Sequence, residues 1–212
     1  LHARITGEAQ GYYADFAEPG AWTKAYGGAF LHNGTWSTFR DRVWGAPVPE
    51  DTDPRRFVVF GSNHDQIGNR AFGERLTHLA NADALHAAQV LLLLCPQIPM
   101  LFMGEEWGSL CPFLYFTSHH GTLAEAVRDG RRREFAKFAA FADPQQRERI
   151  PDPNDERTYL ASCPGKADES HPESLGWLNR TRQLLTLRNG QIIPRLPGTR
   201  ALDAVPLGKA GA

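Results

Sequence analysis

The fold is decided by the run Phe57-Val58-Val59-Phe60-Gly61-Ser62-Asn63-His64-Asp65-Gln66. Its four leading apolar residues favour β structure and predict a short buried strand of the kind found in parallel sheets. A second apolar run, Pro99-Met100-Leu101-Phe102-Met103, predicts another such strand. Residues 83–94 between the two runs predict a helix that Asn81 or Asp83 can cap. Strand, helix and strand in this order predict an α/β fold with parallel strands and a right-handed crossover.

The sequence outside this unit predicts further helices and loops. Apolar residues at helical spacing predict helices over residues 123–141 and 175–188, and Pro19 near a first turn predicts a short helix over residues 19–31. Polar or proline-punctuated stretches predict loops over residues 1–17, 62–82 and 144–155. A β element is expected to begin at Gln191.

The composition is that of an ordinary globular protein with almost no net charge. The chain has 212 residues, of which 42% are hydrophobic and 22% are charged, and its formal net charge is -1. This balance provides no field that would attract nucleic acid or an anionic membrane, and it suits a neutral substrate such as a sugar. The longest apolar run, Val90 to Cys95, is far too short to span a membrane.

The cysteines and the ends of the chain bear on compartment and cofactors. Cys95, Cys111 and Cys163 are odd in number and lack metal-ligand spacing, so neither a disulfide framework nor a zinc site is expected. Reduced thiols and the lack of a signal-peptide pattern at Leu1 predict a cytoplasmic protein. No metal or cofactor is expected, since glycine-rich phosphate motifs are absent too. Both ends look cut, so the chain is expected to be a fragment.

A first cluster of chemically active side chains follows the first predicted strand. Asn63, His64, Asp65 and Gln66 are consecutive, and Arg70 follows closely. Their amide, imidazole, carboxylate and guanidinium groups supply the donors and acceptors that sugar hydroxyls need. Active sites of α/β folds are built at this end of the strands. A turn in which side chains bind backbone N–H groups explains the same residue types equally well.

A second cluster, Glu105-Glu106-Trp107, follows the second predicted strand. Carboxylates beside an aromatic face are a common sugar-binding arrangement. A solvated loop with the tryptophan packed on its rim is the simpler interpretation of these residues alone. Three further aromatic residues are candidate stacking platforms or, more simply, packing anchors: Trp36, Phe39 and Trp44.

Several blocks, taken in order, resemble known enzymes. Residues 57–65 and 98–106 resemble the seventh and eighth barrel strands of the α-amylase superfamily. A more specific resemblance, to the malto-oligosyltrehalose trehalohydrolase family, is carried by residues 1–13, 64–76, 112–119 and 126–135. The first of these blocks resembles that family's segment around the sixth strand.

The resemblance implies a fold and a domain arrangement. It predicts a partial (β/α)8 TIM barrel with about strands 6 to 8 and their helices, followed by the start of a C-terminal β-domain. Residues 1–160 would then form the C-terminal part of the catalytic barrel. Residues 161–190 would form the last barrel-associated helix and a connection, and residues 191–212 the start of a truncated β-domain.

The resemblance also implies an activity. The family cleaves, with retention, the α-1,4 bond next to the terminal trehalose unit of malto-oligosyltrehalose and releases trehalose. A functional link to malto-oligosyltrehalose synthase is implied as well. Asp65 matches the carboxylate that stabilises the transition state, and His64 matches a residue that hydrogen-bonds the same sugar. The other expected substrate-binding residues are Asn63, Gln66, Arg70, Glu105, Glu106, Trp107 and Trp44.

The same resemblance sets a limit on this chain. The nucleophile and the general acid of the family follow the fourth and fifth strands, and no segment here resembles either motif. The isolated chain is therefore expected to be inactive. Two other interpretations stay open: a glycogen-branching or other α-amylase-superfamily enzyme, and a non-catalytic carbohydrate-binding or structural fragment.

Overall fold

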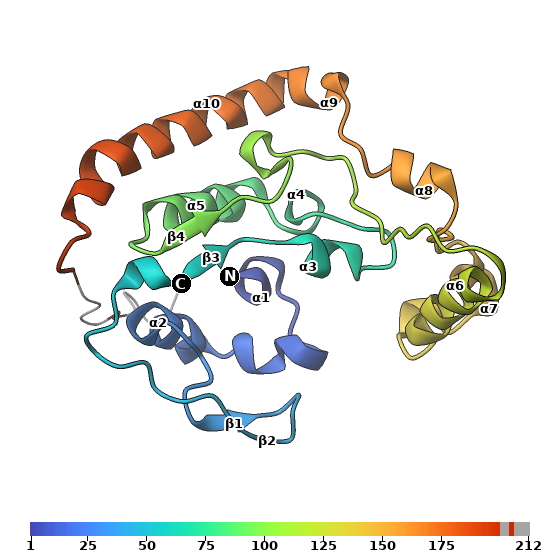
Figure 1. Cartoon of the computed structure of the whole chain (residues 1–212), viewed down its shortest axis with the longest axis horizontal. Coiled ribbons are helices and arrows are strands. Elements are labelled where there is room, and N and C mark those ends of the chain that lie inside the picture. Colours follow the sequence, from blue (N-terminus) through green and yellow to red (C-terminus); the bar gives the residue numbers. More distant parts are fainter. Residues whose placement is uncertain (200–203, 206–212) are drawn as a thin grey trace. The chain divides into compact units, whose positions relative to one another are not determined.

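A computed structural model describes residues 1–199, 204 and 205 of the chain. The chain divides into two compact units, which are described separately below (Figure 1). The first unit contains Leu1–Gly61, Ala80–Met100 and the chain from Thr181 onward, and the second contains Ser62–Leu79 and Leu101–Arg180. No helix in the described part of the chain has the length and apolar character needed to cross a membrane.

The first unit contains a hairpin, a strand-helix-strand element and several helices. Its α-helices are α1 (His2–Thr6), α2 (Pro19–Gly28) and α5 (Ala82–Leu94). Its strands are β1 (Thr35–Ser37), β2 (Arg42–Trp44), β3 (Val58–Phe60) and β4 (Ile98–Met100). Short 3-10 or π segments cover Gly11–Phe16, Pro54–Arg56, Arg188–Ile192 and Ile193–Arg195.

The second unit is built from short helices and loops. Its α-helices are α3 (His64–Gly68), α4 (Leu76–Leu79), α6 (Gly121–Phe135), α7 (Pro144–Glu148), α8 (Glu156–Leu160) and α9 (Lys166–Ser170). Two 3-10 turns cover Glu105–Trp107 and Ala139–Phe141. A small core of Ala71, Phe135 and Ile150 forms beside α6 and α7, which lie together in Figure 1. Helix α10 (Pro172–Leu187) begins in this unit and ends in the first.

The predicted strand-helix-strand element is confirmed. Strand β3 pairs in parallel with β4, with Val58 opposite Ile98 and Phe60 opposite Met100, and α5 connects the two strands. Asn81 caps α5, since its Oδ1 accepts a hydrogen bond of 2.8 Å from the backbone N–H of Ala84. This choice between the two candidate caps follows from position, because an N-cap side chain reaches the third residue of the helix.

The two strands are shorter and more exposed than predicted. Val58 is 55% exposed and Ile98 is 46% exposed, so the prediction of buried strands is wrong for this chain. Among the described residues β3 and β4 pair only with one another, and parallel strands are normally covered on both faces. Strand β4 also ends at Met100 rather than Met103.

Several segments predicted as loops contain helical turns. Residues 62–82 include α3 and α4, and residues 1–17 include α1 and a 3-10 helix. In α3 the Oδ1 of Asn63 accepts a hydrogen bond of 2.9 Å from the backbone N–H of Gln66, so a polar stretch forms a capped helix. The connection after residue 143 begins with α7 for the same reason, since Asp143 caps it.

Three other boundaries differ from the sequence prediction. The helix expected over residues 123–141 ends at Phe135. The hairpin of β1 and β2 was not predicted, and its strands are only three residues each. The β element expected from Gln191 is wrong for the described residues that follow it, because Arg188–Ile192 and Ile193–Arg195 are helical. Residues 200–203 and 206–212, where that element would continue, lie outside the described residues.

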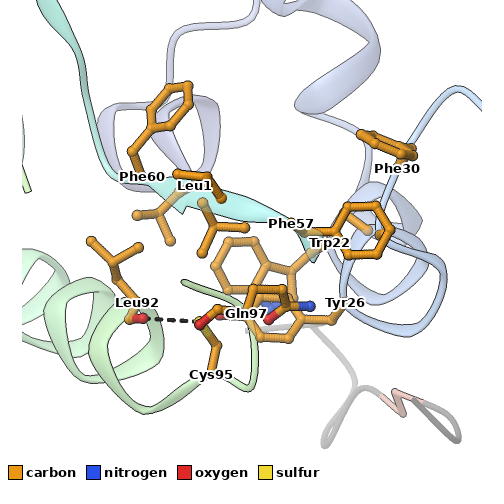
Figure 2. Close-up of a pocket in the computed structure, with 13 residues that line it drawn as sticks. Leu1, Trp22, Tyr26, Phe30, Phe57, Phe60, Leu92, Cys95 and Gln97 are labelled. Carbon is orange, nitrogen blue, oxygen red and sulfur yellow. Dashed lines mark hydrogen bonds between the residues drawn. The ribbon is translucent and has the colours of Figure 1, made fainter. Parts of the chain in front are cut away.

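The first unit also contains an apolar pocket between α2, β3 and α5 (Figure 2). Its volume is about 190 Å³, and its lining includes Trp22, Tyr26, Phe57, Leu92 and Cys95. Burial raises the pKa of Tyr26 to about 12, as expected for a phenol in such surroundings. None of the candidate sugar-binding residues lines this pocket. A cavity with so few polar groups suits an apolar side chain rather than a sugar, so it is not the candidate active site.

Candidate active site

Asp65 and His64 are presented to solvent by the first turn of α3. Their side chains are 71% and 69% exposed, and His64 Nε2 lies 3.4 Å from Asp65 Oδ1. The two residues before the pair are held by the protein: Ser62 is 3% exposed, and Asn63 caps the helix. The turn explanation therefore applies to Asn63, whereas the carboxylate of Asp65 and the imidazole beside it can meet a ligand.

The two remaining polar residues of this cluster point partly into the protein. The Oε1 atom of Gln66 is buried and has no hydrogen-bond partner within the described residues. Arg70 donates from Nε to Oε2 of Glu74 at 3.3 Å, so its guanidinium is already engaged by an acid four positions further along the chain. These two residues are less available to a sugar than Asp65 and His64 are.

Glu105 joins the two sequence clusters within the second unit. Its Oε1 accepts a hydrogen bond from the hydroxyl of Ser62, and its Oε2 accepts one of 2.9 Å from the backbone N–H of Phe102. Burial raises the pKa of Glu105, and the hydrogen bonds from Ser62 and Phe102 oppose this shift. Because both carboxylate oxygens are used inside the protein, Glu105 has the surroundings of a scaffold residue.

Glu106 and Trp107 are half-buried and lie on the same loop. The Oε2 of Glu106 accepts a hydrogen bond of 2.9 Å from the backbone N–H of Gly104. The indole N–H of Trp107 donates to Oδ2 of Asp168 at 2.9 Å. The orientation of the Trp107 ring is thus set by a hydrogen bond at one edge, as is usual for a partly buried indole N–H.

Asp168 is a site residue that the sequence analysis missed. Besides Trp107 it accepts hydrogen bonds from the Ser109 hydroxyl at 2.6 Å and from the Leu110 backbone N–H at 3.1 Å. Burial acts to raise the pKa of Asp168, but the hydrogen bonds from Ser109 and Trp107 outweigh it and leave the pKa lowered. Nothing in the sequence spacing links Asp168 to this loop, because the two are brought together only by tertiary packing.

Trp177 and Arg75 were also missed. Trp177 donates from its indole N–H to the carbonyl of Glu105 at 2.9 Å, and its ring packs against Gly108. Arg75 is 3% exposed and donates to carbonyls of the same loop. Arg75 lies in residues 64–76, one of the blocks that resemble the family, and this position could have drawn attention to it. Its residue type alone gave no indication of a role.

Trp44 belongs to the first unit and lies in the hairpin of β1 and β2. The guanidinium carbons of Arg40 and Arg42 lie 4.1 and 4.7 Å from its ring centre. These cations occupy space over the ring that a sugar face would use. Trp36 and Phe39 in the same segment are 58% and 59% exposed and are the more open aromatic faces.

Metal chemistry has no candidate site in the part of the chain that the structure describes. No group of three or more His, Cys, Asp or Glu side chains there could hold a metal ion.

The arrangement of the chain matches a solved structure from Salmonella typhimurium that is provisionally described as an α-amylase. The two share 42% sequence identity with a TM-score of 0.86, and the match covers 94% of this chain and 33% of that chain. No protein-family model matches the chain. The protein therefore has an α/β fold of the α-amylase type, with the Asp65 and Glu105 segments following its two parallel strands.

Curated relatives define the family more closely. The chain is 46% identical over 174 residues to a malto-oligosyltrehalose trehalohydrolase from Arthrobacter ramosus, a match that covers 82% of this chain and 29% of that protein. It is 47% identical over 135 residues to the enzyme of this name from Saccharolobus solfataricus, covering 63% of this chain and 24% of that protein. The chain belongs to the malto-oligosyltrehalose trehalohydrolase family, as its sequence predicted. It spans less than a third of the length of the curated relatives it matches.

Proposed function

We propose that this chain is the C-terminal part of a retaining glycosidase that cleaves the α-1,4 bond next to the terminal trehalose unit of malto-oligosyltrehalose. The observation that carries the proposal is the exposed Asp65–His64 pair on α3, directly after β3, in a chain of this family. The preceding residues Ser62 and Asn63 are tied by internal hydrogen bonds, while the side chains of the pair remain open. A neutral oligosaccharide also suits the nearly balanced charge of the chain.

Asp65 acts by stabilising charge in this proposal. Cleavage of a glycosidic bond passes through an oxocarbenium-like state in which the sugar ring becomes positive. A fixed carboxylate near that ring stabilises the transition state more than the neutral ground state, which lowers the barrier. His64, at 3.4 Å from Asp65, hydrogen-bonds the same sugar and holds it against the carboxylate.

The other candidate residues divide into two groups by their surroundings. Glu106 and Trp107 are the sugar-contacting groups of the second cluster, with Gln66 and Arg70 as further polar contacts. Asn63 and Glu105 hold the two segments in shape, since the first caps α3 and the second uses both oxygens internally. Trp44 contacts sugar only if Arg40 and Arg42 move away from its ring.

The larger architecture is proposed from the exposure of the strands. We assign β3 and β4 to the seventh and eighth strands of a (β/α)8 barrel. Parallel strands carry apolar residues on both faces because both faces are covered in the complete fold. The exposed Val58 and Ile98 fit strands whose covering elements come from elsewhere in a longer protein. In this proposal residues 1–160 belong to the barrel, and residues 161–190 form its last helix and a connection.

The nucleophile and the general acid belong to other segments of the enzyme in this proposal. The chain alone then binds neither the leaving group nor the attacking water in a productive way, so it is inactive. The substrate carries trehalose at its end, so an enzyme that converts the reducing end of an α-glucan into trehalose, a malto-oligosyltrehalose synthase, must supply it.

The test is a product analysis with the full-length protein that contains this chain. Maltopentaosyl trehalose and plain amylose are offered separately, and the products are separated by chromatography. Free trehalose from the first substrate and no new branch points in the second are expected. Branching of amylose without trehalose release would instead establish a branching enzyme. Binding of both glucans without any cleavage would establish a non-catalytic module.

A further inference from the structure

One buried side chain holds both ends of the loop that carries Glu105, Glu106 and Trp107. This loop, residues 103–111, is called the acidic loop below. Nη1 of Arg75 donates to the carbonyl of Met103 at 2.7 Å, and its Nε donates to the carbonyl of Cys111 at 2.5 Å. The guanidinium therefore closes the acidic loop, because its two bonds fix the first and last residues of the loop to one rigid plane.

The backbone of the acidic loop is shaped to pass close to this guanidinium. Gly104 has a φ of 91°, and a side chain there would bring its Cβ to 2.7 Å from the Ser109 Cβ and 3.4 Å from Arg75 Nη1. The backbone N–H of Ser109 donates to the Gly104 carbonyl at 2.9 Å and closes a tight turn inside the loop. The carbonyl of Met103 can reach Arg75 because a glycine follows it.

Three acidic side chains in or beside the acidic loop act on the charge of Arg75. Burial lowers the pKa of Arg75, whereas Glu105, Glu106 and Asp168 act in the opposite direction and favour the charged form. The ring of Phe102 lies 5.4 Å from the guanidinium carbon and adds a cation–π contact. The negative charges in and beside the acidic loop therefore help to keep the buried guanidinium charged.

We propose that Arg75 is the positioning residue that pre-forms Glu106 and Trp107 as a sugar-binding surface. This role rests on the proposed function and deepens it, because Arg75 does not itself touch the sugar. Asp168 completes the arrangement by holding the indole N–H of Trp107, and Trp177 holds the carbonyl of Glu105. Only a guanidinium supplies two donors at the fixed spacing that both loop ends require.

The first unit offers a matched control of the same chemistry. Arg188 is 5% exposed and donates to the carbonyls of Leu93, Cys95 and Gln97 at 3.0, 2.6 and 2.7 Å. It holds the end of α5 and belongs to the other unit, so it has no role in the acidic loop. Arg188→Lys therefore measures how much stability the protein loses when a buried guanidinium with several hydrogen bonds to carbonyls is replaced.

The experiment compares Arg75→Lys, Arg75→Met and Arg188→Lys in the full-length protein. Amide hydrogen exchange is followed for residues 102–111 and for α6, and kcat and KM are measured on maltopentaosyl trehalose. We expect Arg75→Lys to speed exchange in the acidic loop alone, and to raise KM about tenfold or more with kcat changed by less than about threefold. Arg75→Met should change both the exchange of the acidic loop and KM more strongly than Arg75→Lys does. Arg188→Lys should lower Tm but change neither the exchange of the acidic loop nor KM.

Three results would overturn the proposal. The first is unchanged exchange and KM in Arg75→Lys. The second is faster exchange in Arg75→Lys throughout the protein rather than in the acidic loop alone, since that marks a general scaffold residue. The third is a fall in kcat at constant KM. If the wild-type protein releases no trehalose, the proposed function fails, but loop-specific exchange still decides whether Arg75 sets the acidic loop. Arg75→Lys keeps the charge, so the comparison survives if Arg75→Met does not fold.

Discussion

The hydroxyl of Ser62 donates a hydrogen bond to Oε1 of Glu105. These two residues are 43 positions apart, and each follows one strand of the parallel pair by a few residues. The bond thus joins the segment that carries Asp65 to the acidic loop. One half-buried carboxylate connects the two segments of the candidate site, so Glu105 helps to set their relative position.

The burial of Glu105 gives the stability of the protein a pH dependence that can be measured. Burial raises the pKa of Glu105 above its ordinary value of 4.5. The folded state therefore binds this proton more tightly than the unfolded state does. The contribution of Glu105 to stability is full below pH 4.5 and is lost as the pH rises through its raised folded pKa. Glu105→Gln cannot ionise, so its free energy of unfolding relative to wild type should increase with pH.

The measurement is urea unfolding of both proteins between about pH 4 and about pH 8. Glu105→Gln is not expected to be the more stable protein at every pH, since an amide can keep only one of the two hydrogen bonds that the carboxylate accepts. The pH trend is therefore the readout. Glu125→Gln, at an exposed position of α6, is the control and should show no trend. A constant difference between wild type and the Glu105 variant across this range would contradict the prediction.

Asp65→Asn tests the transition-state carboxylate. The substitution keeps size and hydrogen bonding but removes the negative charge, so kcat on maltopentaosyl trehalose should fall by about 100-fold or more. Asp83→Asn is the matched control, because Asp83 is also an acid in the first helical turn of its element, α5. Both variants should unfold at similar temperatures. Wild-type turnover in the Asp65 variant would remove Asp65 from the mechanism.

A pair of glycines tests the backbone of the second unit. Gly73 has a φ of 61°, and an added Cβ would lie 2.4 Å from the carbonyl oxygen of Phe113. Gly73→Ala should therefore destabilise the protein by about 1–3 kcal/mol. Gly130 lies inside α6 with nothing within 4 Å of an added Cβ. Gly130→Ala should stabilise by about 0.5–1 kcal/mol. Urea unfolding decides both, and equal effects at the two positions would refute the backbone argument.

The hairpin offers a test of the two tryptophans. Trp44 carries two guanidinium groups near its ring, and each cation–π contact at an exposed site is worth about 0.5–1 kcal/mol. Trp44→Ala should therefore lower the free energy of unfolding by about 1 kcal/mol. Trp36 is 58% exposed, so Trp36→Ala should change it by less than about 0.5 kcal/mol. Urea unfolding measures both values. A larger loss of stability in Trp36→Ala than in Trp44→Ala would show that the two arginines do not stabilise Trp44.

The sequence by itself determined the α/β class, the parallel strand-helix-strand element and the family. The first two follow from local signals, because apolar runs, caps and prolines act on residues close in the chain, whereas the family follows from the resemblance of several sequence blocks. Residue type alone narrowed the cap of α5 to Asn81 or Asp83, and the residues beside Asp65 singled out that carboxylate. The small helix α3 was missed because its polar sequence is made helical by the Asn63 cap rather than by apolar periodicity, and α4 is too short, at four residues, to show a period.

Only the tertiary structure decided which candidate side chains are open to solvent and which are engaged inside the protein. It turned the carboxylate of Glu105 inward to Ser62, covered the ring of Trp44 with arginines, and left Asp65 and His64 open. It also brought Arg75 and Asp168 to the acidic loop, although Asp168 is 61 positions from Trp107. The physical reason is that burial and hydrogen bonding depend on residues far apart in sequence, whereas a sequence motif contains only residues that are adjacent in the chain.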